Sequence, residues 1–246
     1  MNAFVSGPES PSLPPTLVAA LRQARAWGFL GDGPLDVHLA HAHGFADASE
    51  SVDAGGIDPL SPPAVGESQA GTWLDLGSGG GIPGLVLANR WPHREAVLLD
   101  SSERRARFLA QTVENLGWAD RVRVVTARAE LAGRDPALRG AFSLVVARSF
   151  GPPPVTAECG APFLRREGLL IVSEPPILPS AYGDDDARWP VDGLAALGLE
   201  RHSLWRGKFG YRVLRQSREC PERFPRRVGV PAKRPLYRTA EVSSSD

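Results

Sequence analysis

Short apolar runs alternate with amphipathic stretches along most of the chain from residue 72 onward. Five of these runs predict buried strands, at residues 72–76, 95–100, 121–127, 141–147 and 169–174. Stretches at 83–89, 101–117 and 153–165 predict helices between the strands. Buried strands that alternate with helices are typical of an α/β fold, in which helices cover both faces of a parallel sheet.

Two further strands are predicted at residues 199–206 and 208–215. Because only one residue separates them, they are expected to form an antiparallel pair. Added to the five parallel strands, this pair predicts a seven-stranded, mostly parallel sheet.

The N-terminal third follows a different pattern. Apolar residues at helical spacing predict an amphipathic helix within residues 13–31, and a weaker helical stretch runs from 34 to 48. Residues 49–71 are rich in Gly, Pro and Ser, which is typical of a linker or surface loop. The predicted organisation is therefore an N-terminal helical extension (1–48), a linker (49–71), an α/β domain (72–217) and a C-terminal tail (218–246).

Charge is balanced overall but unevenly distributed. The 246 residues carry 28 Lys and Arg against 28 Asp and Glu. Residues 1–70 hold two arginines against eight acids, whereas residues 201–240 hold twelve basic residues against two acids. A basic C-terminal tail of this kind favours a polyanionic partner. The alternatives are a solvated basic surface, or a tail that pairs with the acidic N-terminal third.

Specific residues of the basic region are candidates for nucleic-acid binding, because cations contact phosphates and aromatic rings stack on bases. Tyr211, Phe224 and Tyr237 lie between the cations. The RNA-binding candidates are Arg206, Lys208, Arg212, Arg215, Arg226, Arg227, Lys233 and Arg234.

Composition excludes several classes of protein. Cys159 and Cys220 are the only two cysteines, too few for a disulfide framework or a four-ligand zinc site. His38, His41 and His43 lack neighbours at zinc-ligand spacing, so no metal site is predicted. No apolar stretch is long enough to span a membrane and the first residues do not resemble a secretory signal, so a reduced, cytoplasmic protein is expected.

A glycine-rich loop follows the first predicted strand, with the sequence DLGSGGGIPG at residues 75–84. Glycines at this point allow the backbone to approach a ligand closely and to turn into the next helix. Residues 79–84 also match the dinucleotide fingerprint G-x-G-x-x-G, which is weak evidence alone. The acid Asp75, two residues before Gly77, favours S-adenosylmethionine over NAD, because the pattern D-x-G-x-G holds the amino-acid end of that cofactor. Asp100, at the end of the second strand, would accept the ribose hydroxyls of either cofactor.

Five motifs in order along residues 71–236 carry a resemblance to a known family. They are LDLGSGGGIPGLVLA, LLDSSERRARFL, ARAE, ARSFGPP and the basic segment FPRRVGVPAKRPL. Together they resemble the small-subunit ribosomal RNA guanine-N7 methyltransferases, also called glucose-inhibited division protein B. The resemblance implies a class I S-adenosylmethionine-dependent methyltransferase with a Rossmann-like fold. It also implies ribosomal RNA or the small ribosomal subunit as partner.

The resemblance also implies a set of cofactor-binding residues. Carried over from the motifs, these are Gly77, Ile82, Ala129, Glu130 and Arg148, which Asp75, Gly79 and Asp100 join on the chemical argument above. No catalytic acid or base is predicted, since guanine N7 already carries a free lone pair. Arg148 and Phe150 are candidates for positioning the acceptor, Phe150 by stacking on a purine.

Two departures from the family pattern concern the substrate side. The N-terminal region lacks the family's Asn-Leu-Thr segment and its His-x-x-Asp-Ser-Leu-like helix, and Ser173-Glu174-Pro175-Pro176 replaces a Lys-Gly pair. Two alternatives therefore stay open: a methyltransferase of the same fold with another RNA or a small-molecule substrate, and a non-catalytic RNA-binding protein that keeps the cofactor fold. An NAD-dependent oxidoreductase is a remote third, because no Tyr-x-x-x-Lys pair is evident.

Overall fold

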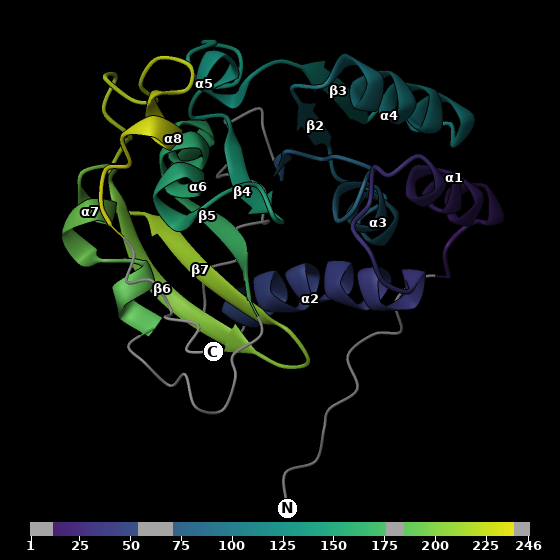
Figure 1. The fold of residues 1–246 in the computed structure, drawn as a ribbon, viewed down its shortest axis with the longest axis horizontal. Coiled ribbons are helices and arrows are strands. Elements are labelled where there is room, and N and C mark those ends of the chain that lie inside the picture. Colours follow the sequence, from purple (N-terminus) through teal and green to yellow (C-terminus); the bar gives the residue numbers. More distant parts are fainter. Residues whose placement is uncertain (1–11, 54–70, 176–184, 239–246) are drawn as a thin grey trace, which may run out of the picture.

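The computed structural model describes residues 12–53, 71–175 and 185–238 (Figure 1). Residues 54–70 of the predicted linker and residues 239–246 of the predicted tail lie outside the described residues. Among the helices of the described part of the chain, none is long and apolar enough to cross a membrane.

One seven-stranded sheet forms the centre of the α/β domain. Its strands lie in the order β3-β2-β1-β4-β5-β7-β6. Strands β1 to β5 are parallel, and β7 runs antiparallel to both of its neighbours, β5 and β6. The predicted α/β fold, with an antiparallel pair that completes a mostly parallel sheet, is therefore confirmed. The strands are β1 (Trp73–Leu76), β2 (Ala96–Asp100), β3 (Val122–Thr126), β4 (Phe142–Ala147), β5 (Leu164–Glu174), β6 (Leu199–Arg206) and β7 (Gly210–Gln216).

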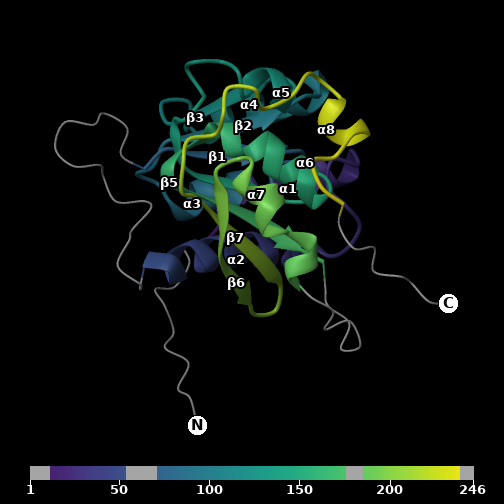
Figure 2. The same ribbon diagram turned by 90° about the vertical axis from the view of Figure 1, so that its left-hand side faces the viewer.

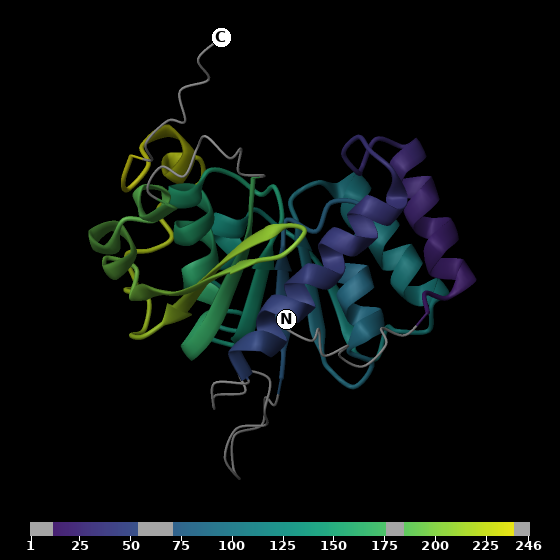
Figure 3. The same cartoon turned by 90° about the horizontal axis from the view of Figure 1, so that it is seen from below.

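Helices cover both faces of this sheet (Figures 1 and 3). Along β4, Leu144 and Val146 pack into a cluster with side chains of α1 to α4, whereas Val145 and Ala147 pack into a second cluster with α5, α6 and α7. Burial on both faces explains why the strands are nearly continuous apolar runs. The helices are α1 (Pro15–Ala26), α2 (Leu35–Asp53), α3 (Gly84–Arg90), α4 (Glu103–Asn115), α5 (Ala129–Ala132), α6 (Pro153–Gly160), α7 (Val191–Ala195) and α8 (Val230–Lys233).

The carboxyl edge of the sheet is where the topology predicts a ligand site. The chain order reverses between β1 and β4, which lie side by side, and open α/β sheets bind ligands outside the carboxyl ends of strands at such a point. The hairpin between β6 and β7 also reaches this edge, because Glu174 at the end of β5 pairs with Gly210.

Two elements extend beyond the predicted bounds. Helix α2 continues to Asp53, five residues past the predicted end at residue 48. Val52 is buried and Glu50 forms an ion pair with Arg90 of α3 at 2.7 Å, so tertiary contacts extend the helix where the local sequence indicated a linker. Strand β5 starts at Leu164 rather than at residue 169. Its register against β4 shifts between Leu164 and Leu169, so the turn-like residues up to Gly168 form an irregular part of the strand.

Candidate functional site

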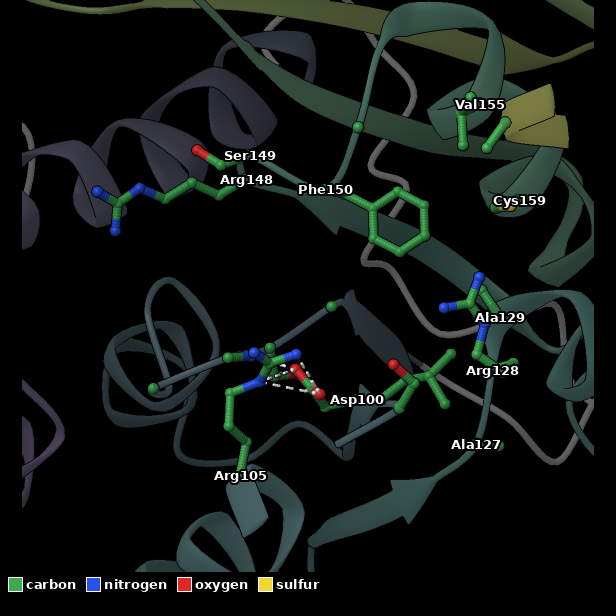
Figure 4. A pocket seen from close by; sticks show the side chains of 18 of the residues that line it. Asp100, Arg105, Ala127, Arg128, Ala129, Arg148, Ser149, Phe150, Val155 and Cys159 are labelled. Carbon is green, nitrogen blue, oxygen red and sulfur yellow. Dashed lines mark hydrogen bonds and ion pairs between the residues drawn. The ribbon is translucent and has the colours of Figure 1, made fainter. Parts of the chain in front are cut away.

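A cavity of about 570 Å³ opens at the carboxyl edge of the sheet (Figure 4). Its walls come from the segments that follow β1, β2, β3 and β4, together with two contributions from outside the α/β core. Seven of the eight predicted cofactor residues line it: Gly77, Gly79, Ile82, Asp100, Ala129, Glu130 and Arg148. The volume lies within the range typical of small-molecule sites, about 300–1,000 Å³.

The glycine-rich loop forms the floor of this cavity and tolerates no side chain at two points. Gly77 has a φ of 78°, and a Cβ placed there would lie 2.7 Å from the Phe150 ring. A Cβ at Gly80 would lie 2.7 Å from a methyl carbon of Leu30. A side chain at Gly77 would be strained by the positive φ and the Phe150 ring, and one at Gly80 would have to displace Leu30.

Asp75 lies behind the loop rather than on the cavity wall. Its side chain is fully buried, Oδ2 accepts a hydrogen bond from the Gly84 amide at 3.0 Å, and its backbone carbonyl accepts one from the Ser78 hydroxyl at 3.0 Å. Burial raises the pKa of the Asp75 carboxyl from 3.8 to about 7. In this structure Asp75 therefore connects the start of the glycine loop to the first residue of α3.

Asp100 ends β2 on the cavity wall, and its carboxylate already accepts several hydrogen bonds. The amides of Gly79 and Ser102 each donate to one of its oxygens at 2.8 Å. The Arg105 side chain forms an ion pair with it, in which Nε lies 3.1 Å from both oxygens and Nη2 lies 2.9 Å from Oδ1 (Figure 4). Sequence reasoning missed Arg105, although its place on the first turn of the helix after Asp100 was a usable signal.

Glu130 links the cavity wall to the basic tail. Its Oε1 accepts hydrogen bonds from the Gly229 amide at 2.9 Å and from Arg128 Nη2 at 3.2 Å. Burial raises the pKa of the Glu130 carboxyl, but these hydrogen bonds and the Arg128 charge outweigh it and lower the pKa overall. Beyond this contact, Ala232 and Pro235 of the tail line the cavity.

A second acidic residue besides Glu130 holds the C-terminal tail on the α/β domain. Glu158 of α6 is completely buried, and Arg226 donates to it from its backbone amide, from Nε and from Nη2 at 2.6–2.9 Å. Helix α8 packs beside α6 as a result (Figure 2). In the described part of the chain, the tail therefore pairs with the α/β domain.

Arg148 and Phe150 follow β4 and occupy different parts of the wall. Arg148 points toward α2, where its Nη2 lies 2.6 Å from Nδ1 of His38, whereas the Phe150 ring lies over Gly77 (Figure 4). Ser149 between them has a φ of 51°, and this left-handed conformation separates the two neighbouring side chains.

The N-terminal extension supplies a wall that sequence reasoning missed. Phe29, Leu30 and Gly31, in the loop between α1 and α2, line the cavity. The apolar pair directly after an amphipathic helix gave no indication of this contact, which brings together segments about fifty residues apart in the chain.

The RNA-binding candidates differ in burial and in the partners that they contact. Arg212 is buried on β7, and the partly exposed Arg226 is engaged by Glu158. Arg206 and Lys208 lie at the hairpin that reaches the carboxyl edge of the sheet, and Arg215 pairs with Glu200 and Glu167. The candidates that are exposed on the tail are Arg227, Lys233 and Arg234.

The other candidate residues form neither a metal site nor a reactive thiol in the described part of the chain. Within residues 12–53, 71–175 and 185–238, no three His, Cys, Asp or Glu side chains gather as metal ligands. Cys159 lines the cavity, but burial raises the pKa of its thiol to about 12, so it stays protonated. Glu174, in the segment that departs from the family pattern, accepts hydrogen bonds from the side chains of Arg188 and Trp189.

Two solved structures share the fold of this chain. A protein of Corynebacterium glutamicum aligns with a TM-score of 0.53 at 17% sequence identity, over 85% of this chain and 93% of its own. A protein from Klebsiella pneumoniae assigned as an O-methyltransferase aligns with a TM-score of 0.51 at 13% identity, over 86% and 91%. At these identities the likeness concerns the fold alone, and it confirms the Rossmann-like architecture with a seven-stranded, mostly parallel sheet.

Proteins similar in sequence identify the family of this chain, which the solved structures do not. The family profile of rRNA small subunit methyltransferase G (GidB) matches residues 57–174. Proteins named ribosomal RNA small subunit methyltransferase G are similar along the chain. That of Parasynechococcus marenigrum is 36% identical over 185 residues, and that of Prochlorococcus marinus strain MIT 9313 is 37% identical over 185 residues. Each alignment covers 72% of this chain and 73% of the relative. The resemblance found in the motifs is therefore confirmed: the chain belongs to the ribosomal RNA small subunit methyltransferase G family.

Proposed function

We propose that this protein transfers the methyl group of S-adenosylmethionine to guanine N7 in small-subunit ribosomal RNA. The observation that carries the proposal is the cavity at the carboxyl edge of the sheet, between β1 and β4. One of its walls carries a carboxylate, Asp100, and another carries a guanidinium, Arg148. A member of this family needs such a site to hold a ligand that carries both a ribose and a carboxylate.

The residues of the cavity fit S-adenosylmethionine. Asp100 would accept hydrogen bonds from the ribose hydroxyls, and Ala129 would pack on the adenine. Arg148 would bind the carboxylate of the methionine end, the partner that a guanidinium recognises best. The Gly77 and Gly79 backbones, with Ile82, would form the floor between these ends. Asp75 contributes by fixing the loop to α3, since Gly84 donates to it at 3.0 Å.

Methyl transfer from a sulfonium is an in-line displacement, so the protein must align the acceptor with the methyl group rather than remove a proton from it. Guanine N7 requires no general base, which agrees with a cavity whose only thiol, Cys159, stays protonated. Phe150, on the floor beside Gly77, is the aromatic side chain suited to stack on the purine.

Exposed cations near the cavity support an RNA substrate. Lys233 and Arg234 are exposed next to Ala232 and Pro235, which line the cavity, and Arg227 is exposed on the same segment. Arg206 and Lys208 lie at the hairpin at the same edge of the sheet. Exposed cations at the edge of the sheet where a cavity opens can hold the phosphates that flank an unpaired nucleotide.

Calorimetric titration with S-adenosylmethionine and with NAD tests the cofactor assignment. We expect binding of the first alone, with affinity reduced more than about tenfold in Asp100→Ala, because a hydrogen bond to a charged group contributes about 1.5–3 kcal/mol. Asp120→Ala, an exposed acid outside the cavity, is the matched control. Binding of NAD alone would contradict the methyltransferase reaction. Binding of neither ligand would instead support the non-catalytic RNA-binding alternative.

A further inference from the structure

The N-terminal extension reaches the cavity through two adjoining features. The loop between α1 and α2 places Phe29, Leu30 and Gly31 on the wall, and Leu30 covers Gly80 of the glycine loop. The first turn of α2 carries His38, which is only 5% exposed. These contacts make the acidic N-terminal third part of the site.

His38 connects the loop to Arg148. Its Nε2 lies 3.0 Å from the carbonyl oxygen of Gly31, and its Nδ1 lies 2.6 Å from Nη2 of Arg148. A carbonyl oxygen can only accept a hydrogen bond, so Nε2 must donate. A guanidinium can only donate, so Nδ1 must accept. The two contacts therefore specify one form of the ring, the neutral imidazole with its proton on Nε2.

Arg148 depends on such a contact because its side chain is long and crosses the end of the cavity toward α2 (Figure 4). Without a fixed acceptor, a guanidinium loses rotamer entropy whenever it binds an anion, at a cost of about 0.5–1.5 kcal/mol. An acceptor that is itself anchored to the backbone removes part of that cost before the ligand arrives. The Gly31 carbonyl provides the anchor for His38.

We propose that His38 is a positioning residue that orients Arg148 toward the carboxylate of the bound cofactor, and that the N-terminal extension thereby completes the methionine end of the site. This inference rests on the proposed function, because it assumes a ligand of the S-adenosylmethionine type in the cavity.

The test compares two ligands that differ only at the methionine end. S-adenosylhomocysteine carries the carboxylate, whereas 5′-methylthioadenosine has the same nucleoside and lacks it. Calorimetry is performed on the wild type, on His38→Leu, which fills the space without accepting a hydrogen bond, and on His38→Gln, whose amide oxygen can accept one from Arg148. His202→Ala, an exposed histidine on β6, is the matched control.

We expect His38→Leu to weaken S-adenosylhomocysteine binding by up to about fivefold, while the affinity for 5′-methylthioadenosine stays unchanged within error. His38→Gln is expected to restore most of the loss. In a double-mutant cycle with Arg148→Ala, the second substitution at His38 should add little, because His38 acts through Arg148.

Three results would overturn the inference. The first is an equal loss of affinity for both ligands in His38→Leu, which would indicate a general disruption of the cavity wall. The others are wild-type affinity for S-adenosylhomocysteine in His38→Leu, and additive effects of the two substitutions in the double-mutant cycle. If the wild type binds neither ligand, the proposed function fails, and the inference fails with it. The two failures are thus distinguishable by the behaviour of the wild type.

Discussion

Two aspartates at one edge of the sheet differ in role because they differ in surroundings. Asp75 and Asp100 end or nearly end neighbouring strands, β1 and β2. Asp75 is enclosed and receives the amide of Gly84, whereas Asp100 faces the cavity and is paired with Arg105. Burial favours the neutral acid at Asp75. At Asp100, a guanidinium and two backbone amides donate hydrogen bonds to the carboxylate.

The raised pKa of Asp75 has a consequence for stability. Its pKa rises from 3.8 in the unfolded chain to about 7 in the folded protein, so the folded state holds a proton that the unfolded state loses between these values. The stability that Asp75 contributes is therefore complete below the lower value and is lost as pH rises toward the upper one. We expect the free energy of unfolding of the wild type, relative to Asp75→Asn, to fall across this interval. Urea unfolding at several pH values measures it, and a pH-independent difference would contradict the buried, protonated acid.

Arg105 competes with the cofactor for Asp100. The two amides and the guanidinium occupy the carboxylate, which offers about four acceptor positions, so ribose hydroxyls would displace Arg105. An ion pair with a partly exposed arginine contributes at most about 1 kcal/mol, so Arg105→Ala should strengthen S-adenosylmethionine binding by up to about fivefold in calorimetry. A weakening of tenfold would show that Arg105 contacts the cofactor instead.

At the scale of elements, the tail is fixed by the pairing of Arg226 with the buried Glu158. Removal of one partner leaves a buried charge uncompensated, and we expect Arg226→Ala to lower the free energy of unfolding by about 3 kcal/mol. Arg227→Ala, at the exposed neighbouring position, should change it by less than about 0.5 kcal/mol. Denaturant unfolding measures both changes. Equal losses of unfolding free energy in the two variants would mean that the ion pair does not fix the tail.

Helix α2 and strand β7 approach closely at Gly44. A Cβ there would lie 2.7 Å from two ring carbons of Tyr211, whose hydroxyl donates to the His41 carbonyl. Alanine improves helix propensity by about 1 kcal/mol, but overpacking costs about 1–3 kcal/mol, so Gly44→Ala should be destabilising on balance. Gly31→Ala is the control, because no atom lies within 4 Å of that Cβ. A stabilised Gly44→Ala variant in thermal unfolding would contradict the contact.

The elements differ in how far the sequence predicted them. The parallel strands and the glycine loop follow from local patterns, since apolar runs and glycine spacing are visible along the chain. The pairing of Arg226 with Glu158 joins residues 68 apart, and that of His38 with Arg148 joins residues 110 apart. Such contacts exist only once the elements have packed, so no spacing in the sequence indicates them. For the same reason, Arg212 and Arg226 were predicted as surface cations although packing engages both.

On the scale of the whole molecule, exposed cations of the tail and of the β6–β7 hairpin lie at the edge of the sheet where the cavity opens. If the tail contacts phosphates, the binding of small-subunit ribosomal RNA fragments should weaken with salt, and each lost contact should reduce the log–log slope by about 0.7 for single strands. The double variant Lys233→Ala/Arg234→Ala should therefore lower the slope by between about 1 and 2. The charge-matched control is Arg165→Ala/Arg166→Ala, at the amino-terminal end of β5 and therefore away from the carboxyl edge where the cavity opens. Equal slopes for both double variants would remove the tail from the RNA interface.

The reaction itself tests the central claim most directly. Purified protein is incubated with S-adenosylmethionine that carries an isotopically labelled methyl group and with small ribosomal subunits from a strain that lacks this protein. The RNA is then digested and its nucleosides are resolved by mass spectrometry. We predict labelled 7-methylguanosine with the wild type and much less with Asp100→Ala when the cofactor concentration is near the wild-type Kd. Label on a different nucleoside or atom, or no transfer by a wild type that binds the cofactor, would contradict methylation of guanine N7.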